Sequence, residues 1–73
     1  MITIYTLENC PNCKMLMKRL RGLRLRYEER QMDVAESITE MRVNQCFINE
    51  APVLEVDNVF MTYEEANKWL DME

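Results

Sequence analysis

The chain has 73 residues, 48% of them hydrophobic and 30% charged, and its formal net charge at pH 7 is −4. These values predict one globular domain over residues 1–73, and an acidic chain of this composition is not expected to bind nucleic acid. Neither an apolar stretch long enough to cross a bilayer nor a basic, apolar leader is present, so we expect a cytoplasmic protein with no membrane partner.

The first two predicted elements meet at a pair of cysteines. Residues 2–6 (ITIYT) are β-branched or aromatic and predict a strand. A helix is expected to begin near Cys10, because Pro11 has no N–H to satisfy and fits the first helical position. Gly22 is expected to end this helix in the left-handed conformation. The predicted buried face of the helix consists of Cys13, Leu16 and Leu20.

Positive charge is concentrated in and just after this helix. The segment from Cys10 to Arg26 holds six basic residues and no acidic one, although the whole chain has nine basic and thirteen acidic residues. Two interpretations remain open: an ordinary solvated face, or a basic rim that draws anionic substrates toward the cysteines. The six residues are Lys14, Lys18, Arg19, Arg21, Arg24 and Arg26.

The middle of the chain predicts a strand and a second helix. Residues 23–28 (LRLRYE) alternate between apolar and charged side chains, which is typical of an edge strand with one solvated face. Asp33 and Glu36 have the spacing of a capping box and predict the start of a helix. The apolar stripe of that helix is expected to consist of Val34, Ile38 and Met41.

The last third predicts a loop, a hairpin and a helix. Residues 44–52 are expected to form the loop, and segments 53–56 and 59–62 two strands. Asp57 and Asn58 join these strands, because both residue types tolerate the left-handed conformations of a tight turn.

The final helix completes an alternating α/β pattern. Thr62 and Glu65 predict a capping box at its start. The resulting order is β-α-β-α-β-β-α, in which the first two strands should be parallel with a right-handed crossover and the closing hairpin antiparallel. The core residues expected from the last helix are Ala66, Trp69 and Leu70.

The CPNC stretch places Cys10 and Cys13 within reach of a disulfide at the start of a helix. The helix dipole, with the positive charge of Lys14, favours a thiolate at Cys10. Such a thiolate attacks a substrate disulfide, and the more buried second thiol then resolves the mixed disulfide. Pro11 stiffens the turn, and Asn12 is small enough to leave the first sulfur accessible. Cys10 is therefore the predicted nucleophile and Cys13 the resolving thiol.

Other interpretations of the cysteines stay open. In one alternative, Cys10 and Cys13 are unreactive residues of the core. In another, they bind a metal together with Cys46 as third ligand and an acid such as Glu8 as fourth. The chain has no histidine, and nothing in the spacing demands a metal, so no metal ligand is predicted. Cys46 alone is expected to be a free thiol in its loop. The rival functions are a cysteine-based metal or iron–sulfur carrier and a non-catalytic binding domain.

With IYTLENCPNC before a helix and Ala51-Pro52-Val53 forty residues later, the chain resembles the glutaredoxins of the thioredoxin superfamily over essentially its whole length. The resemblance implies a minimal thioredoxin fold, whose four-stranded mixed sheet has the order 2-1-3-4 and is flanked by three helices. It also implies a cis bond before Pro52, beside the cysteines, which lets Ala51 offer its backbone to a peptide or to glutathione. The substrate-binding residues expected are Pro11, Asn12, Ala51, Pro52, Thr62 and Tyr63.

The resemblance implies a dithiol–disulfide oxidoreductase that reduces protein or glutathione-mixed disulfides, acts as a monomer and binds no cofactor tightly. Glutathione as co-substrate, or a thioredoxin reductase, would supply electrons. The chain also resembles the small glutaredoxin-like proteins that serve ribonucleotide reductase. It departs from the family at Asn12, where an aromatic residue is frequent, and before the last helix, where a glycine pair is missing. Together with Glu64 and Glu65, these departures argue against tight glutathione binding.

Overall fold

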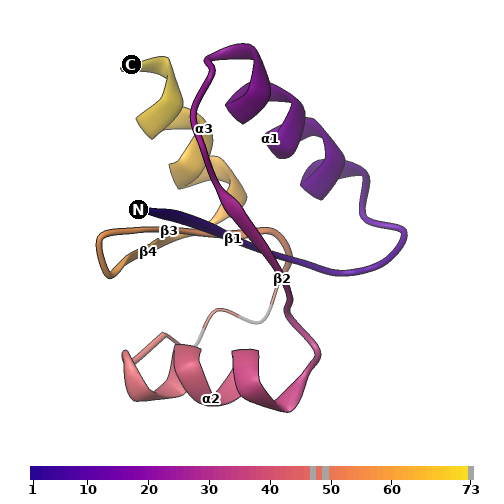
Figure 1. The fold of residues 1–73 in the computed structure, drawn as a ribbon, viewed down its shortest axis with the longest axis vertical. Coiled ribbons are helices and arrows are strands. Elements are labelled where there is room, and N and C mark those ends of the chain that lie inside the picture. The colour runs from indigo at the N-terminus through magenta and orange to yellow at the C-terminus, as the bar shows by residue number, and fades with distance from the viewer. Residues whose placement is uncertain (47, 49, 73) are drawn as a thin grey trace.

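The computed structural model describes residues 1–46, 48 and 50–72. Within these residues the strands form a sheet in the order β2-β1-β3-β4, and β1 is parallel to β2 and antiparallel to β3 (Figure 1). The predicted element order and strand order are confirmed. No helix in the described ranges is both long and apolar enough to span a membrane. The elements are β1 (Ile2–Thr6), α1 (Pro11–Gly22), β2 (Glu28–Gln31), α2 (Ala35–Val43), β3 (Val53–Val56), β4 (Val59–Met61) and α3 (Tyr63–Asp71).

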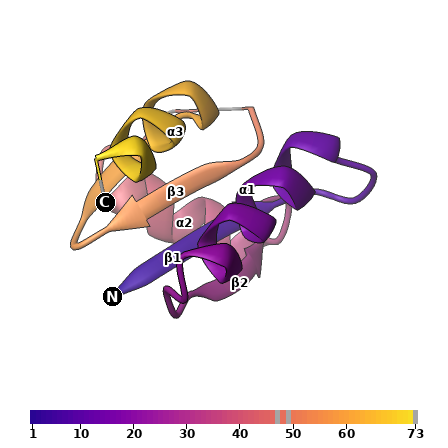
Figure 2. The same ribbon diagram turned by 90° about the horizontal axis from the view of Figure 1, so that it is seen from above.

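Helices α1 and α3 cover one face of the sheet, and α2 covers the other (Figures 1 and 2). Side chains alternate along β1, so that Ile4 points toward α1 and α3 while Tyr5 points toward α2. The first helix buries Leu16 and Leu20 completely against Ile4, as predicted. The full buried cluster on this face is Ile4, Leu16, Leu20, Leu54, Met61, Ala66 and Leu70.

Among the described residues, the buried apolar cluster on the opposite face is smaller, and Met41 is its member from α2. Polar contacts add to it: the Tyr5 hydroxyl donates to Glu40 Oε2 at 3.1 Å, and Arg30 on β2 donates to the same carboxylate. The buried cluster on this face is Tyr5, Met32, Met41, Cys46 and Val53.

The second strand lies at the sheet edge, as predicted, but its predicted bounds are wrong. The prediction gave residues 23–28, whereas β2 begins only at Glu28. Helix α1 continues through Gly22, whose φ is not positive, and Arg24 takes the left-handed conformation instead, with φ 58°. The Leu25 N–H donates to the Leu20 carbonyl at 2.9 Å, and the Arg24 N–H to the Arg21 carbonyl at 3.0 Å, which is the Schellman pattern. Leu25 packs on the core and thereby fixes the place where the chain reverses.

The predicted start of α2 is also wrong. Its N-cap is Val34, one residue later than the capping box requires, and no side chain caps the helix. Met32 is buried and its N–H donates to the Thr6 carbonyl at 2.7 Å, which sets where the turn before the helix lies. Of the three predicted stripe residues Met41 is buried, and Ser37 is the other buried residue of α2. The other two predicted stripe residues, Val34 and Ile38, are 45% and 42% exposed.

The C-terminal predictions hold, except that β4 ends at Met61 and not at Thr62. Asp57 and Asn58 join β3 and β4 with φ values of 48° and 70°, as expected for a tight hairpin turn. Thr62 and Glu65 form the capping box of α3. Ala66 and Leu70 are buried and Trp69 packs against them, also as predicted. The predicted loop over residues 44–52 has no helix or strand where it is described, and Phe47 and Asn49 lie outside the described residues.

Candidate active site

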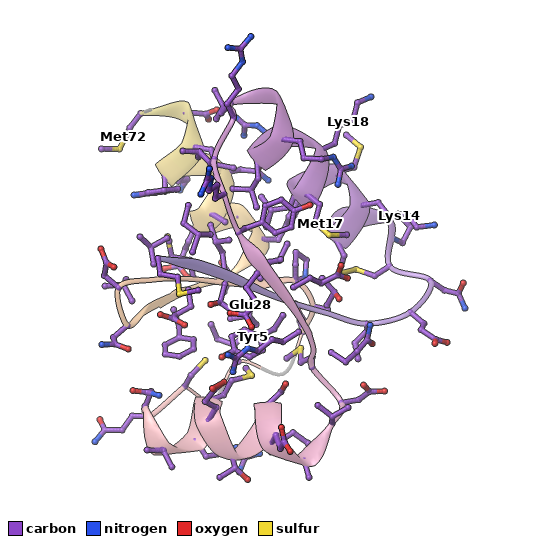
Figure 3. All side chains as sticks on the ribbon, in the orientation of Figure 1. Tyr5, Lys14, Met17, Lys18, Glu28 and Met72 are labelled. Atoms are coloured by element: carbon purple, nitrogen blue, oxygen red, sulfur yellow. A yellow bond between two sulfur atoms is a disulfide. The ribbon has the colours of Figure 1, made fainter. Side chains whose placement is uncertain are left out.

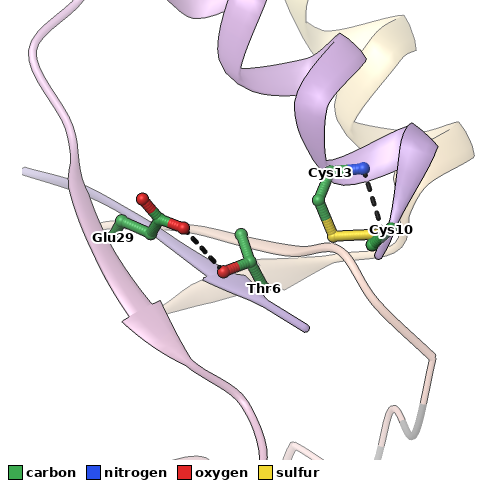
Figure 4. The surroundings of a disulfide bond; sticks show 4 residues. All are labelled: Thr6, Cys10, Cys13 and Glu29. Atoms are coloured by element: carbon green, nitrogen blue, oxygen red, sulfur yellow. Dashed lines mark hydrogen bonds between the residues drawn. A yellow bond between two sulfur atoms is a disulfide. The ribbon is translucent and has the colours of Figure 1, made fainter. Parts of the chain in front are cut away.

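The two cysteines of the CPNC stretch occupy the N-terminal turn of α1. Cys10 is the N-cap residue, in an extended conformation, and Pro11 is the first helical residue, as predicted. The Cα atoms of Cys10 and Cys13 are 5.2 Å apart and the two sulfurs form a disulfide (Figure 4). The two residues differ in access, because Cys13 is 2% exposed while Cys10 is partly exposed.

The helix terminus supports negative charge at Cys10. The backbone N–H of Cys13 donates to the Cys10 sulfur at 3.1 Å, in the position where an N-cap side chain normally accepts. The first turn of α1 contains no acidic residue, and Lys14 follows directly. Once the disulfide is reduced, these donors and the helix dipole favour a thiolate on the first sulfur.

A groove of about 340 Å³ lies beside this turn. It is lined by Asn12 from α1, by the Ala51-Pro52 bond before β3, and by Thr62 and Tyr63 at the start of α3. The Ala51-Pro52 peptide bond is cis, as the family resemblance implied. Five of the six predicted substrate-binding residues therefore line one groove, and the sixth, Pro11, is exposed on the first turn of α1.

The groove carries two carboxylates and no basic side chain among its described lining residues. Glu50 and Glu64 lie along it. Glu65 is instead used inside the capping box, where its carboxylate accepts from the Thr62 N–H at 3.0 Å. This bond, and the contact with the Thr62 side chain, lower the pKa of Glu65. The Thr62 hydroxyl in turn accepts from the Glu65 N–H at 3.2 Å, so the cap already uses that donor.

The basic residues of α1 divide into two groups. Lys14 and Lys18 project from the helix into solvent, away from the sheet (Figure 3). Arg19 instead joins α1 to α3, because its guanidinium donates to Asn67 Oδ1 at 2.8 Å and to Asp71 at 2.7 Å. The predicted basic segment is thus partly an exposed face and partly a contact between helices.

The third cysteine lies apart from the pair. Cys46 is 5% exposed, belongs to the cluster beneath α2 and forms no disulfide. Across the described ranges, no three cysteine, aspartate or glutamate side chains are grouped so that they would hold a metal ion.

One feature of the site was missed by sequence reasoning. Figure 4 shows Thr6, the last residue of β1, between the Cys10–Cys13 disulfide and Glu29 of β2. The Thr6 hydroxyl donates to Glu29 Oε2 at 2.8 Å. The sequence signal was the position of Thr6, two residues after Ile4 and therefore on the α1 face. Glu29 had no such signal, because the predicted second strand ended one residue before it.

Comparison with known proteins agrees with this geometry. The glutaredoxin family model matches residues 2–61. The fold is similar to that of the glutaredoxin-like protein NrdH-redoxin from Escherichia coli, with a TM-score of 0.69 and 20% sequence identity over 92% of this chain and 91% of the other. No curated protein sequence matches the chain. The architecture is therefore the thioredoxin fold predicted from the sequence.

Proposed function

The chain belongs to the glutaredoxin family, and from that premise we propose that it is a dithiol–disulfide oxidoreductase acting mainly on disulfides of protein substrates. The observation that carries the proposal is the unequal cysteine pair at the start of α1. Cys10 is partly exposed and accepts a backbone hydrogen bond, whereas Cys13 is buried behind it. Such an arrangement separates a nucleophile from a resolving thiol.

The reaction proceeds in two displacements. The Cys10 thiolate attacks one sulfur of the substrate disulfide, forms a mixed disulfide and releases the first substrate thiolate. The Cys13 sulfur then attacks the Cys10 sulfur, breaks the mixed disulfide and releases the second substrate thiolate. Two electrons pass from the enzyme dithiol to the substrate, and the enzyme is left as the Cys10–Cys13 disulfide.

The groove beside Cys10 holds the substrate in this proposal. An extended segment lies along Ala51 and Pro52 and makes backbone hydrogen bonds like an added strand. Asn12 and Tyr63 line the same groove and contact the segment there. Pro11, exposed on the first turn, contacts the segment that carries the substrate sulfur.

The charges of the groove favour a protein substrate over glutathione. Glutathione carries two carboxylates, and Glu50 and Glu64 lie along the groove where it would bind. Repulsion between these carboxylates and those of glutathione weakens binding, although solvent screens the effect. We therefore propose that a thioredoxin reductase is the main electron source and that glutathione is at most a weak co-substrate. A protein such as ribonucleotide reductase, in the cytoplasm, fits as the electron acceptor.

A side-by-side turnover assay tests the proposal. The protein is supplied with insulin as disulfide substrate and reduced either by NADPH with thioredoxin reductase, or by NADPH with glutathione reductase and glutathione. Turnover should be faster in the first system. Cys10→Ser should abolish it in both, and Cys46→Ala is the matched control that should keep it. Full activity of Cys10→Ser would contradict the proposed function.

A second comparison tests the charges of the groove. Replacing both Glu50 and Glu64 by glutamine should lower the KM for glutathione by about threefold to tenfold, since each exposed charge contributes roughly 0.5 kcal/mol. Glu36→Gln, the same change at an exposed glutamate on α2 that does not line the groove, is the control. An unchanged KM would mean that these carboxylates do not select the reductant.

A further inference from the structure

We propose that Thr6 and Glu29 form a proton route from the buried thiol of Cys13 to solvent during the resolving displacement. This inference rests on the proposed function, because it concerns the second step of the same reaction. It assigns a role to two residues outside the CPNC motif and the groove. Thr6 would exchange a proton with the reacting thiol, and Glu29 would act through Thr6.

The sheet register brings the two residues together beneath the first turn of α1. Thr6 follows Ile4 on the same face of β1, and Ile4 packs against Leu16 and Leu20. Helix α1 returns antiparallel over β1, so Cys13, one turn before Leu16, lies above the end of the strand. Figure 4 shows this arrangement, in which Thr6 lies between the disulfide and Glu29 and its hydroxyl is turned toward Glu29.

Glu29 reaches the same point from the neighbouring strand. It pairs in register with Ile4, and its side chain therefore points to the α1 face. Its Oε2 accepts from the Thr6 hydroxyl at 2.8 Å. Thr6 is 2% exposed whereas Glu29 is exposed, so the pair connects a buried position with water.

The resolving step requires such a connection. Cys13 is 2% exposed, and its thiol must lose a proton as its sulfur attacks Cys10. The chain has no histidine to accept that proton. A threonine hydroxyl that donates its hydrogen to a carboxylate keeps two lone pairs that accept hydrogen bonds from other donors. In the proposed route the Thr6 oxygen accepts from the Cys13 S–H once the disulfide is reduced, while its hydroxyl donates to Glu29.

In the resolving step one proton leaves the site and one disulfide bond replaces another. The Cys13 proton moves to the Thr6 oxygen, the Thr6 hydroxyl proton moves to the Glu29 carboxylate, and Glu29 then releases it to water. The electron pair left on the Cys13 sulfur forms the bond to Cys10, and the bond between Cys10 and the substrate sulfur breaks. The departing substrate thiolate takes a proton from solvent.

Other titratable groups near this end of α1 are less suited to the task. Cys10 is the target of the attack and is already bound to the substrate. Lys14 carries its ammonium into solvent (Figure 3), and Glu8 is exposed in the turn before the helix. Tyr63 approaches from α3 but lies on the groove side. Among the described hydrogen bonds on this face of the sheet, only the Thr6–Glu29 bond connects a buried group with an exposed carboxylate.

The experiment separates the two displacements in one trace. Reduced protein carrying Cys46→Ala is mixed with Ellman's reagent in a stopped-flow instrument, and the released thionitrobenzoate is followed by its absorbance. Attack by Cys10 releases the first equivalent, and resolution by Cys13 releases the second. The second phase therefore reports the resolving step alone, and Cys13→Ser in the same background should remove it.

Glu29→Gln is the decisive variant, because its amide oxygen still accepts from Thr6 but is not basic. We expect its second phase to be slower at pH 7 by about tenfold or more, as for loss of a general base. Its rate should also rise about tenfold per pH unit below the thiol pKa, whereas the wild-type rate should rise less steeply. Thr6→Val should behave alike, and Thr6→Ser should restore the rate.

Glu28→Gln is the matched control, because Glu28 is an adjacent exposed glutamate on the opposite face of the sheet. Its second phase should equal that of the wild type. If Glu29→Gln shows the same second-phase rate and pH slope as Glu28→Gln, the proton route is refuted. Failure of the proposed function looks different, because the first phase would then be absent or insensitive to Cys10→Ser.

Discussion

The two faces of the sheet are built in different ways. On one face α1 and α3 bury a cluster of seven residues, five of which have no exposed surface. On the other face α2 adds Met41 to a cluster of five among the described residues and leaves Val43 75% exposed. The first face is held by apolar packing, and the second depends more on the polar contacts of Tyr5, Arg30 and Glu40.

The difference follows the position of the chemistry. The cysteines begin α1, so the helix that must hold two sulfurs in register is the one with the larger core beneath it. The cis bond before Pro52 and the N-cap of α3 lie at the same end. Helix α2 carries no residue of the groove. A site needs fixed geometry, and dense packing is what provides it.

The largest expected effect comes from the apolar face. Leu20→Ala should lower the free energy of unfolding by about 4 kcal/mol, because it removes a fully buried side chain from the larger cluster. Met41→Ala beneath α2 should cost only about 2 kcal/mol. The measurement is urea unfolding followed by the fluorescence of Trp69. Equal losses at both sites would show that the two faces contribute alike.

The same pair of variants separates the faces by function. In conditions where both variants are folded, Met41→Ala should reduce insulin at nearly the wild-type rate, since α2 lies away from the groove. Leu20→Ala should be slower, because the start of α1 is less firmly held. A Met41→Ala protein with the larger loss of turnover would contradict the link between packing density and the site.

The second prediction concerns pH and the α2 face. Burial, followed by the hydrogen bond and the negative charge of Glu40, raises the pKa of Tyr5 to about 12 from an ordinary 10.0. Between these values the folded chain keeps a proton that the unfolded chain has lost. The stabilising effect is therefore complete below pH 10 and disappears as pH rises toward 12. It amounts to about 2–3 kcal/mol.

Tyr5→Phe gives the control for that measurement. Lysines titrate over the same range in both proteins, so the wild type minus the variant isolates the phenol. The free energy of unfolding of the wild type should fall more steeply between pH 10 and 12. Parallel pH profiles would mean that the Tyr5 proton does not contribute to folding.

The buried residues that the sequence predicted correctly are those whose signals are local. Apolar spacing identified Leu16, Leu20, Ala66 and Leu70, because these residues repeat with the period of a helix and little else competes. The capping box at Thr62 was also visible, since both of its partners are local. The predicted site residues at Cys10 and Pro52 came from a local motif and a family resemblance.

The errors lie where nonlocal contacts decide. The end of α1 is set by Leu25 on the core and not by Gly22, and the start of α2 is set by buried Met32 and not by Asp33. Neither contact has a signal in neighbouring residues. The Thr6–Glu29 bond was missed for the same reason, because it depends on the register between β1 and β2.

The third prediction tests the polar contacts of α2. Glu40→Ala removes the acceptor of the Tyr5 hydroxyl and the partner of Arg30. The expected loss of stability is about 1 kcal/mol, since hydrogen bonds to charged groups contribute more than this but solvent reaches the carboxylate, which is 40% exposed. Hydrogen exchange should quicken in α2 before it does in α1. Uniform quickening in both helices would contradict a local role.

The smallest expected effect is at the polar contact on the apolar face. Arg19→Ala removes the bonds to Asn67 and Asp71, but the Asp71 side chain is 68% exposed, so the ion pair should contribute less than about 1 kcal/mol. This change should shift the urea midpoint less than Glu40→Ala does, because the leucines already join α1 to α3. Urea unfolding of both variants at low and at high salt checks the order. An Arg19→Ala loss that exceeds the Glu40→Ala loss would mean that α1, like α2, depends on its polar contacts, and the contrast between the two faces would not hold.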